Sequence, residues 1–194
     1  MSTLRAIARG LDRVSVQLNR VGLVVAVLAV LVMLAAASWQ VIARYVLSQP
    51  PIWTEELARF SMVWAGLMGA SCAFRFKADP TLFPEALKAT GAVGVIVTLI
   101  RSAGTLIFVC VCIWFCVFGP GMNIARGYIG RLAGRQAETM DVPMLVFGIA
   151  IPIAFTFIVI HVLADIARLV LPQDRPASEP DVDPDTDPDT DPAT

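Results

Sequence analysis

Long apolar stretches separated by short charged segments run through most of the sequence. Two of these stretches contain no Asp, Glu, Lys or Arg, a third contains only Arg101, and the fourth follows the charged segment 53–59. A helix needs about 20 mostly apolar residues to cross a bilayer, whereas the strands of a membrane barrel are shorter and alternate apolar with polar residues. The pattern therefore predicts an all-α integral membrane protein with four transmembrane helices, at about residues 21–43, 53–74, 89–118 and 144–164.

The basic residues between the spans predict the orientation of the chain. In the predicted topology, one side carries nine Lys and Arg residues and the other side carries five. Because short cytoplasmic segments are enriched in Lys and Arg, we expect the more basic side in the cytoplasm, together with both termini. The tryptophans and tyrosines then fall toward the outer ends of the spans, and such amphipathic side chains favour membrane interfaces.

The segments that flank the membrane domain of residues 21–172 differ in composition. Residues 1–20 place apolar residues at helical spacing with arginines between them, which favours an amphipathic helix on the membrane surface; a disordered basic lead is an equal alternative. A signal peptide cleaved near Ala35–Ala37 is a rival interpretation, but the apolar stretch continues past these small residues. Residues 173–194 repeat acidic residues and prolines, so we expect a disordered acidic tail.

Composition and charge narrow the class of protein. Hydrophobic residues make up 57% of the chain, charged residues 16%, and the mean hydropathy is +0.71. Soluble domains contain about 45–50% apolar and about 25% charged residues. The net charge of −1 conceals a basic membrane domain, because residues 173–194 hold eight acids and one base. A soluble enzyme and a nucleic-acid-binding protein with a basic face are both disfavoured.

The sequence contains no constellation of catalytic or cofactor-binding residues. The single histidine, His161, excludes bis-histidine haem ligation within the chain, and the four cysteines all lie inside predicted spans. We therefore predict no enzyme activity, no cofactor and no metal. Two alternatives stay open: a membrane anchor of a redox complex in which His161 is the only ligand, and a small homodimeric transporter in which Glu55 or Glu56 is the coupling acid.

Charged residues gather at the start of the second predicted span. Thr54 is placed to cap the helix, and Glu55 and Glu56 suit the positive end of its dipole. Arg59 lies four residues after Glu55 and three after Glu56, so it can pair with either, and Arg44 adds another possible cation. These residues either stabilise the helix start or dock another protein, and their spacing favours neither interpretation.

Two further features concern packing. Ala65, Gly69 and Ala73 repeat every four residues beside a bulky stripe that includes Trp53 and Trp64, a pattern typical of close helix approach either within the chain or to a membrane partner. In the third span, Arg101 can extend its side chain to the cytoplasmic interface, where we expect it to pair with Asp165.

The order of these motifs resembles the small membrane subunit of TRAP transporters, the DctQ-like type. The first span ends in Gln40-Val41-Ile42-Ala43-Arg44-Tyr45-Val46, and a short proline loop leads to Trp53-Thr54-Glu55-Glu56-Leu57-Ala58-Arg59-Phe60. Later, Glu138-Thr139-Met140-Asp141-Val142-Pro143 precedes a final span that contains Ile151-Pro152. The resemblance covers roughly residues 10–172. In the loop after the second span, Asp79 matches an acid of the family pattern, but the histidine that often accompanies it is absent.

The resemblance implies a role that composition cannot show. Such systems import organic acids, usually carboxylates, across the bacterial inner membrane with a sodium gradient. A periplasmic DctP-like binding protein delivers the substrate to a large DctM-like permease, and the small subunit braces that permease and widens the docking face, in contact with membrane lipids and without nucleic acid. The expected interface or structural residues are Arg44, Trp53, Glu55, Glu56, Arg59, Trp64, Gly69, Asp79, Arg101, Asp141, Pro143 and Asp165.

Overall fold

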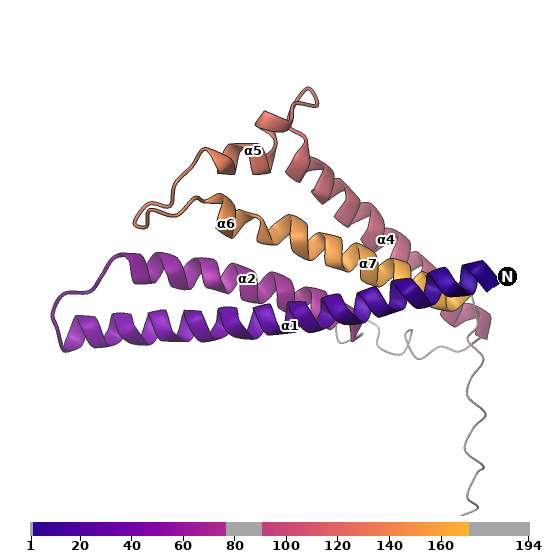
Figure 1. Cartoon of the computed structure of the whole chain (residues 1–194), viewed down its shortest axis with the longest axis horizontal. Coiled ribbons are helices and arrows are strands. Elements are labelled where there is room, and N and C mark those ends of the chain that lie inside the picture. The colour runs from indigo at the N-terminus through magenta and orange to yellow at the C-terminus, as the bar shows by residue number, and fades with distance from the viewer. Residues whose placement is uncertain (1, 77–90, 171–194) are drawn as a thin grey trace, which may run out of the picture.

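The described part of the chain is mostly helical (Figure 1). The computed structural model describes residues 2–76 and 91–170, so Asp79 and the acidic tail of residues 173–194 lie outside the described residues. The elements are α1 (Ser2–Tyr45), α2 (Trp53–Arg75), α4 (Gly91–Val117), the 3₁₀ turn η1 (Ile124–Arg126), α5 (Tyr128–Ala133), α6 (Leu145–Gly148) and α7 (Ala150–Val170).

Four helical stretches are long and apolar enough to cross a membrane. No strand occurs in residues 2–76 and 91–170, where the β-type pairing is limited to two isolated bridges. The prediction of an all-α protein with four membrane spans is therefore confirmed. The four stretches are Ala6–Tyr45, Trp53–Arg75, Val93–Val117 and Leu145–Leu169.

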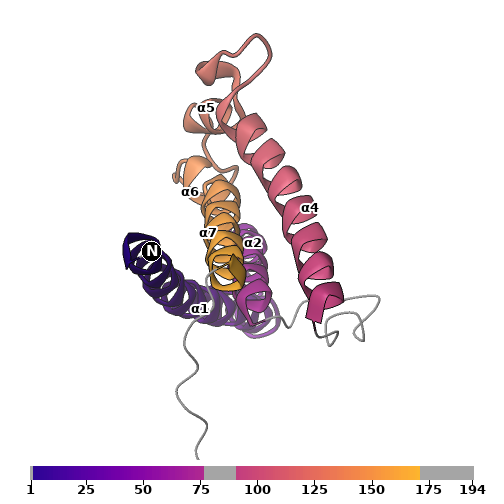
Figure 2. The same cartoon turned by 90° about the vertical axis from the view of Figure 1, so that its right-hand side faces the viewer.

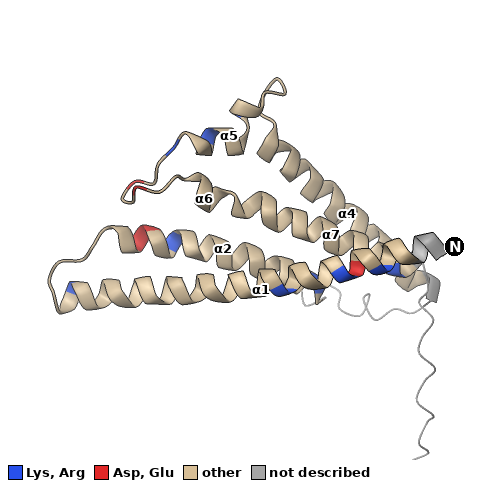
Figure 3. Ribbon diagram, viewed as in Figure 1, with Lys and Arg blue, Asp and Glu red and all other residues tan. Residues whose placement is uncertain are grey.

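The helix α7 lies at the centre of the arrangement. It packs against α1, α2 and α4, while α1 and α2 form a hairpin with each other (Figure 2). We call the end of the bundle at Tyr45 and Trp53 the hairpin end, and the opposite end, where α2 and α7 finish, the N-terminal end. Figure 3 shows most charged residues of α1 and α2 near these two ends, with a long uncharged stretch of α1 between them.

The basic lead and the first predicted span form one uninterrupted helix. With 44 residues, α1 is about 66 Å long at about 1.5 Å per residue, roughly twice the thickness of the hydrocarbon core. Arg13 and Arg20 are exposed on it, whereas Asp12 turns toward α2 and α7. The first half of α1 therefore belongs to the bundle.

Small residues bring α1, α2 and α7 close together. A Cβ on Gly22 of α1 would lie 3.2 Å from the Cys72 sulfur of α2 and 3.7 Å from the Phe157 ring of α7. Ala26, Met68 and Ala154 form the buried core beside this point, one residue from each helix. Close packing of this kind stabilises helices in lipid, where the hydrophobic effect gives no drive for association.

Short elements fold the segment between α4 and α7 back onto the bundle. Isolated bridges join Gly119 to Asn123 and Gln136 to Pro143, and between them η1 and α5 make two short turns. Gly127 is required where α5 begins, because a Cβ there would lie 2.2 Å from the carbonyl oxygen of Val117.

Gly127→Ala should destabilise the protein, because the added methyl group meets backbone that cannot rotate away. Overpacking of this kind costs about 1–3 kcal/mol, and each kcal/mol lowers the melting temperature of a chain of this size by about 2–4 °C. Thermal unfolding of the detergent-purified chain measures the shift. Gly134→Ala is the matched control, since Gly134 ends the same helix and has no neighbour within 4 Å of its Cβ position. Equal melting temperatures for the two variants would contradict the packing argument.

Candidate functional site

The helix α2 begins at Trp53, two residues earlier than a Thr54 cap requires. Ile52 occupies the cap position and no side chain caps the helix. The Thr54 hydroxyl instead donates a 2.7 Å hydrogen bond to the carbonyl oxygen of Pro51, and the residue is fully buried. The expected capping by Thr54 is therefore wrong, because Thr54 already lies inside the first turn of the helix.

Glu55 and Arg59 form the expected pair on the surface of α2. The Arg59 Nη2 and Glu55 Oε1 atoms are 3.1 Å apart, and the two side chains are 63% and 66% exposed, respectively. An exposed pair at this spacing contributes little stability. It leaves one charge of each sign displayed at the hairpin end.

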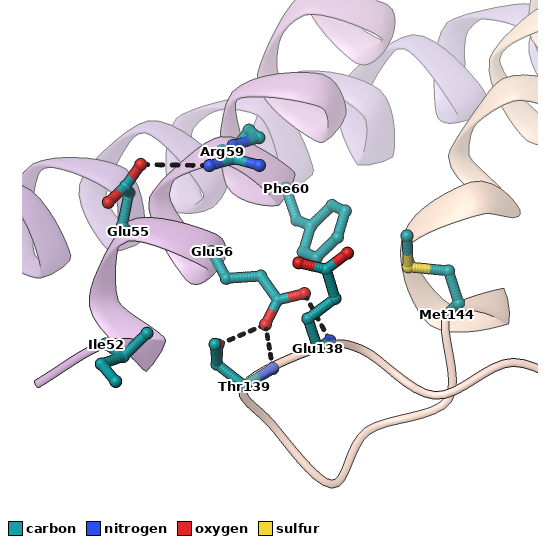
Figure 4. A pocket seen from close by; sticks show the side chains of 8 residues that line it. All are labelled: Ile52, Glu55, Glu56, Arg59, Phe60, Glu138, Thr139 and Met144. Atoms are coloured by element: carbon teal, nitrogen blue, oxygen red, sulfur yellow. Dashed lines mark hydrogen bonds and ion pairs between the residues drawn. The ribbon is translucent and has the colours of Figure 1, made fainter.

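Glu56 holds a distant turn of the chain against α2. Its carboxylate accepts hydrogen bonds from the backbone amides of Glu138 and Thr139, at 2.9 and 2.8 Å, and from the Thr139 hydroxyl (Figure 4). Glu56 is only 7% exposed, so these three donors take the place of water around the charge. We call this arrangement the Glu56 clamp. It replaces the Glu56–Arg59 pairing that the spacing allows.

Two aromatic contacts continue the clamp along α2. The rings of Phe60 and Phe147 stack with their centres 4.1 Å apart. One turn later, the Trp64 indole N–H donates a 3.2 Å hydrogen bond to the carbonyl oxygen of Val146. The start of α2 thus contacts the chain before Pro143, at Glu138 and Thr139, and after it, at Val146 and Phe147. The carbonyl oxygen of Pro143 itself accepts a 3.0 Å hydrogen bond from the Val146 amide.

A cavity of 260 Å³ lies between the start of α2 and this turn. Figure 4 shows the carboxylates of Glu55, Glu56 and Glu138 and the Arg59 guanidinium around it. Within the described part of the chain, no group of three or more His, Cys, Asp or Glu side chains could hold a metal ion. The cavity combines charges of both signs with apolar walls, which suits contact with another surface.

A comparison with protein families identifies the family of this chain. The family described as "Tripartite ATP-independent periplasmic transporters, DctQ component" matches residues 33–171. The match covers most of the chain and includes both sides of the Glu56 clamp. The chain belongs to the DctQ family. A comparison with curated proteins gave no match.

Membership of the DctQ family confirms the resemblance seen in the sequence and makes this chain a component of a TRAP transporter. Together with the four apolar helices, it identifies a multi-pass membrane protein whose class is transport. TRAP transporters are tripartite, so the family implies a permease and a binding protein as partners.

The DctQ structure spreads the other expected residues over both ends of the bundle. Arg44, Trp53 and Asp141 are exposed, and no ion pair between described residues joins Arg44 to Glu55 or Glu56. Gly69 faces open space, because a Cβ added to it would have no neighbouring atom within 4 Å. Of the expected residues, Trp64, Pro143 and the charged cluster of α2 are therefore brought together, while Arg44, Gly69 and Asp141 stand apart from this cluster.

Arg101, which we expected to pair with Asp165, contacts an aromatic ring of α2. The Arg101 guanidinium carbon lies 4.7 Å from the centre of the Phe74 ring, a cation–π contact that links α4 to the end of α2. Arg101 thus lies over an aromatic face, which a search for charged partners alone could not reveal.

A second polar cluster, at the N-terminal end, was not predicted. Asp12 of α1 accepts hydrogen bonds from Arg75 of α2, at 3.1 Å, and from Arg168 of α7. Ser15, one turn later, contacts Arg75 and His161. The sequence signal that could have found it is the spacing of Asp12, Ser15 and Asn19 along one side of a helix.

Glu56→Gln should loosen the turn at Glu138 and Thr139, because an amide offers one acceptor where the carboxylate offers two. Amide hydrogen exchange of the purified DctQ chain should become several-fold faster at these two positions. Glu55→Gln is the matched control, since Glu55 pairs only with Arg59 among the described residues. Unchanged exchange in Glu56→Gln, or the same increase in Glu55→Gln, would show that the clamp does not hold the turn.

Proposed function

We propose that this DctQ chain is a scaffold subunit that braces a large DctM-like permease in a sodium-driven importer of an organic acid, usually a carboxylate. Its hairpin end faces the periplasm of a bacterial inner membrane and widens the docking face for a DctP-like binding protein. Both termini then lie in the cytoplasm, in agreement with the distribution of Lys and Arg. The chain itself coordinates no substrate.

The outward side of α2 carries this proposal. Met62 is 58% exposed, and a Cβ added at Gly66 or Gly69 would meet no atom within 4 Å beyond the adjacent turns of α2 itself. Arg59 and Glu55 lie on the same side, one and two turns before Met62, respectively. Glycines on an exposed helix side allow a neighbouring helix to approach closely in lipid, and the charged pair can fix its register at the membrane surface.

The two alternative functions receive less support. The redox anchor needs His161 as a ligand to a cofactor shared with a partner, but the His161 side chain is 1% exposed inside the bundle of this chain. The self-sufficient transporter needs Glu55 or Glu56 in the middle of the membrane, but both lie in the first turn of α2, and Glu56 is occupied by the clamp. Family membership favours the scaffold role over both.

Purification of the tagged chain from its native membrane tests the scaffold role. A large multi-span permease should copurify with the wild-type chain, and Gly66→Leu should reduce its yield because leucine fills the space that a partner helix needs. Gly10→Leu is the control, since Gly10 also has open space around its Cβ position but lies at the other end of the chain. A lone homodimer that transports substrate in liposomes would contradict the proposal.

Uptake by the reconstituted three-component system tests whether import is coupled to the sodium gradient. Import of an organic acid should require this chain and an inward sodium gradient, and should stop when potassium replaces sodium.

Deletion of residues 176–194 should leave uptake unchanged, because we expect that acidic segment to have no fold to lose. Uptake at the wild-type rate without this chain would show that the scaffold is dispensable.

A further inference from the structure

Three helices meet at a buried polar junction near the N-terminal end. Ser15 of α1 is completely buried and His161 of α7 is 1% exposed, and their side chains are joined by a 2.7 Å hydrogen bond between Oγ and Nδ1. Arg75 of α2 donates a second hydrogen bond to the Ser15 oxygen, at 2.5 Å. Ser15 therefore connects the basic end of α2 with the imidazole of α7.

These contacts decide which imidazole nitrogen carries the proton. The Ser15 oxygen accepts from Arg75, and the only acceptor found for its hydroxyl proton among the described residues is His161 Nδ1. A buried imidazole one atom away from a guanidinium is expected to be neutral, since a second positive charge there would be repelled. The neutral ring then has its proton on Nε2, which makes Nε2 a hydrogen-bond donor.

Three buried side-chain atoms at this level have no partner among the described residues: the Nε2 of His161, the Oγ of Ser71 and the Oδ1 of Asn19. Ser71 is completely buried and Asn19 is 8% exposed. A helical serine often donates to the carbonyl oxygen one turn earlier, but Ser71 has no such bond. The three atoms come from α7, α2 and α1, respectively, and amount to two donors and one acceptor.

Contacts of adjacent residues place these three side chains at neighbouring turns of the three helices. The Cys72 sulfur, next to Ser71 in α2, lies 3.5 Å from the backbone oxygen of Asn19. Asn19 follows Ser15 by one turn of α1, and Ser15 binds His161. The junction is thus a polar spot surrounded by the apolar contacts of the same three helices.

We propose that Asn19, Ser71 and His161 hold one internal water molecule where α1, α2 and α7 meet. Its oxygen accepts from His161 Nε2 and from the Ser71 hydroxyl, and one of its hydrogens is donated to Asn19 Oδ1. Internal waters typically make about three hydrogen bonds to buried polar groups that lack protein partners, which is the number of atoms present. A metal ion fits poorly, since one of the three atoms is an N–H donor.

The water links the first half of α1 to the rest of the bundle. Asp12 already fixes α1 to Arg75 and Arg168 at the outer edge of this end, and the water adds a connection one to two turns deeper. Because lipid offers no hydrogen bonds, a shared water stabilises one rotational setting of the three helices relative to each other. The junction thereby positions α1 in the assembled subunit.

Solid-state NMR of the full chain in lipid bilayers, with ¹⁵N-labelled histidine, tests the proposal. His161 is the only histidine, so the spectrum contains one pair of ring nitrogens. We expect a neutral ring protonated at Nε2 and transfer of magnetisation from water protons to Nε2, although the side chain is 1% exposed. Asn19→Leu, which removes the acceptor and fills the space with an apolar side chain, should abolish this transfer.

Ser61→Ala is the matched control, because Ser61 is another buried serine of α2 but has no place in the junction, and it should leave the transfer intact. Absence of transfer in the wild-type chain, or equal transfer in Asn19→Leu, would overturn the proposal. If Asn19→Leu fails to fold, a high-resolution structure of the transporter complex shows whether the water molecule is present. Density within hydrogen-bond distance of the three atoms supports the water, and direct bonds among the three side chains without such density refute it.

Discussion

Inside an apolar bundle, a buried polar group must find its hydrogen-bond partner within the protein, and this constraint fixes where the helices of this DctQ protein meet. Most side chains of the membrane helices do not specify one contact, because an apolar side chain can face either lipid or another apolar side chain. The exceptions are a few polar side chains whose partners lie far away in the sequence. Glu56 reaches residues 82 and 83 positions later, and Ser15 reaches a histidine 146 positions later. Each contact joins segments that are not neighbours in sequence.

The four membrane-spanning helices could be predicted from the sequence because the spanning part of each one satisfies its own backbone within a mostly apolar stretch. For the same reason, the i,i+4 pair of Glu55 and Arg59 could be predicted, since both partners lie on one helix. Contacts between helices could not. Nothing in the spacing around Glu56 indicates Thr139, and nothing near Arg101 indicates that it would lie over the ring of Phe74.

The error at Thr54 has the same physical origin. Sequence rules place a threonine before a helix as its cap, but the helix start depends on where the preceding chain is held. Here Ile52 lies at the cap position and the Thr54 hydroxyl bonds back to Pro51, so the proline loop and the first turn form one unit. The segment thus has the residues of a helix capped by Thr54, but Thr54 lies inside the first turn instead. Only the three-dimensional path of the loop distinguishes these two arrangements.

One side of α2 contacts the rest of the subunit, and the other side is exposed and available to a partner. The inward side uses Glu56, Phe60 and Trp64 for contacts with the turn and with α6, so the start of the helix cannot rotate without breaking all three. The outward side carries the exposed pair of Glu55 and Arg59, which also borders the cavity, and two glycines, Gly66 and Gly69, whose Cβ positions meet no neighbouring atom within 4 Å. A partner that meets this side encounters a surface whose geometry is already fixed, and binding therefore loses less conformational entropy. Rigidity inside the subunit and affinity for a partner outside it are, on this argument, two effects of one clamp.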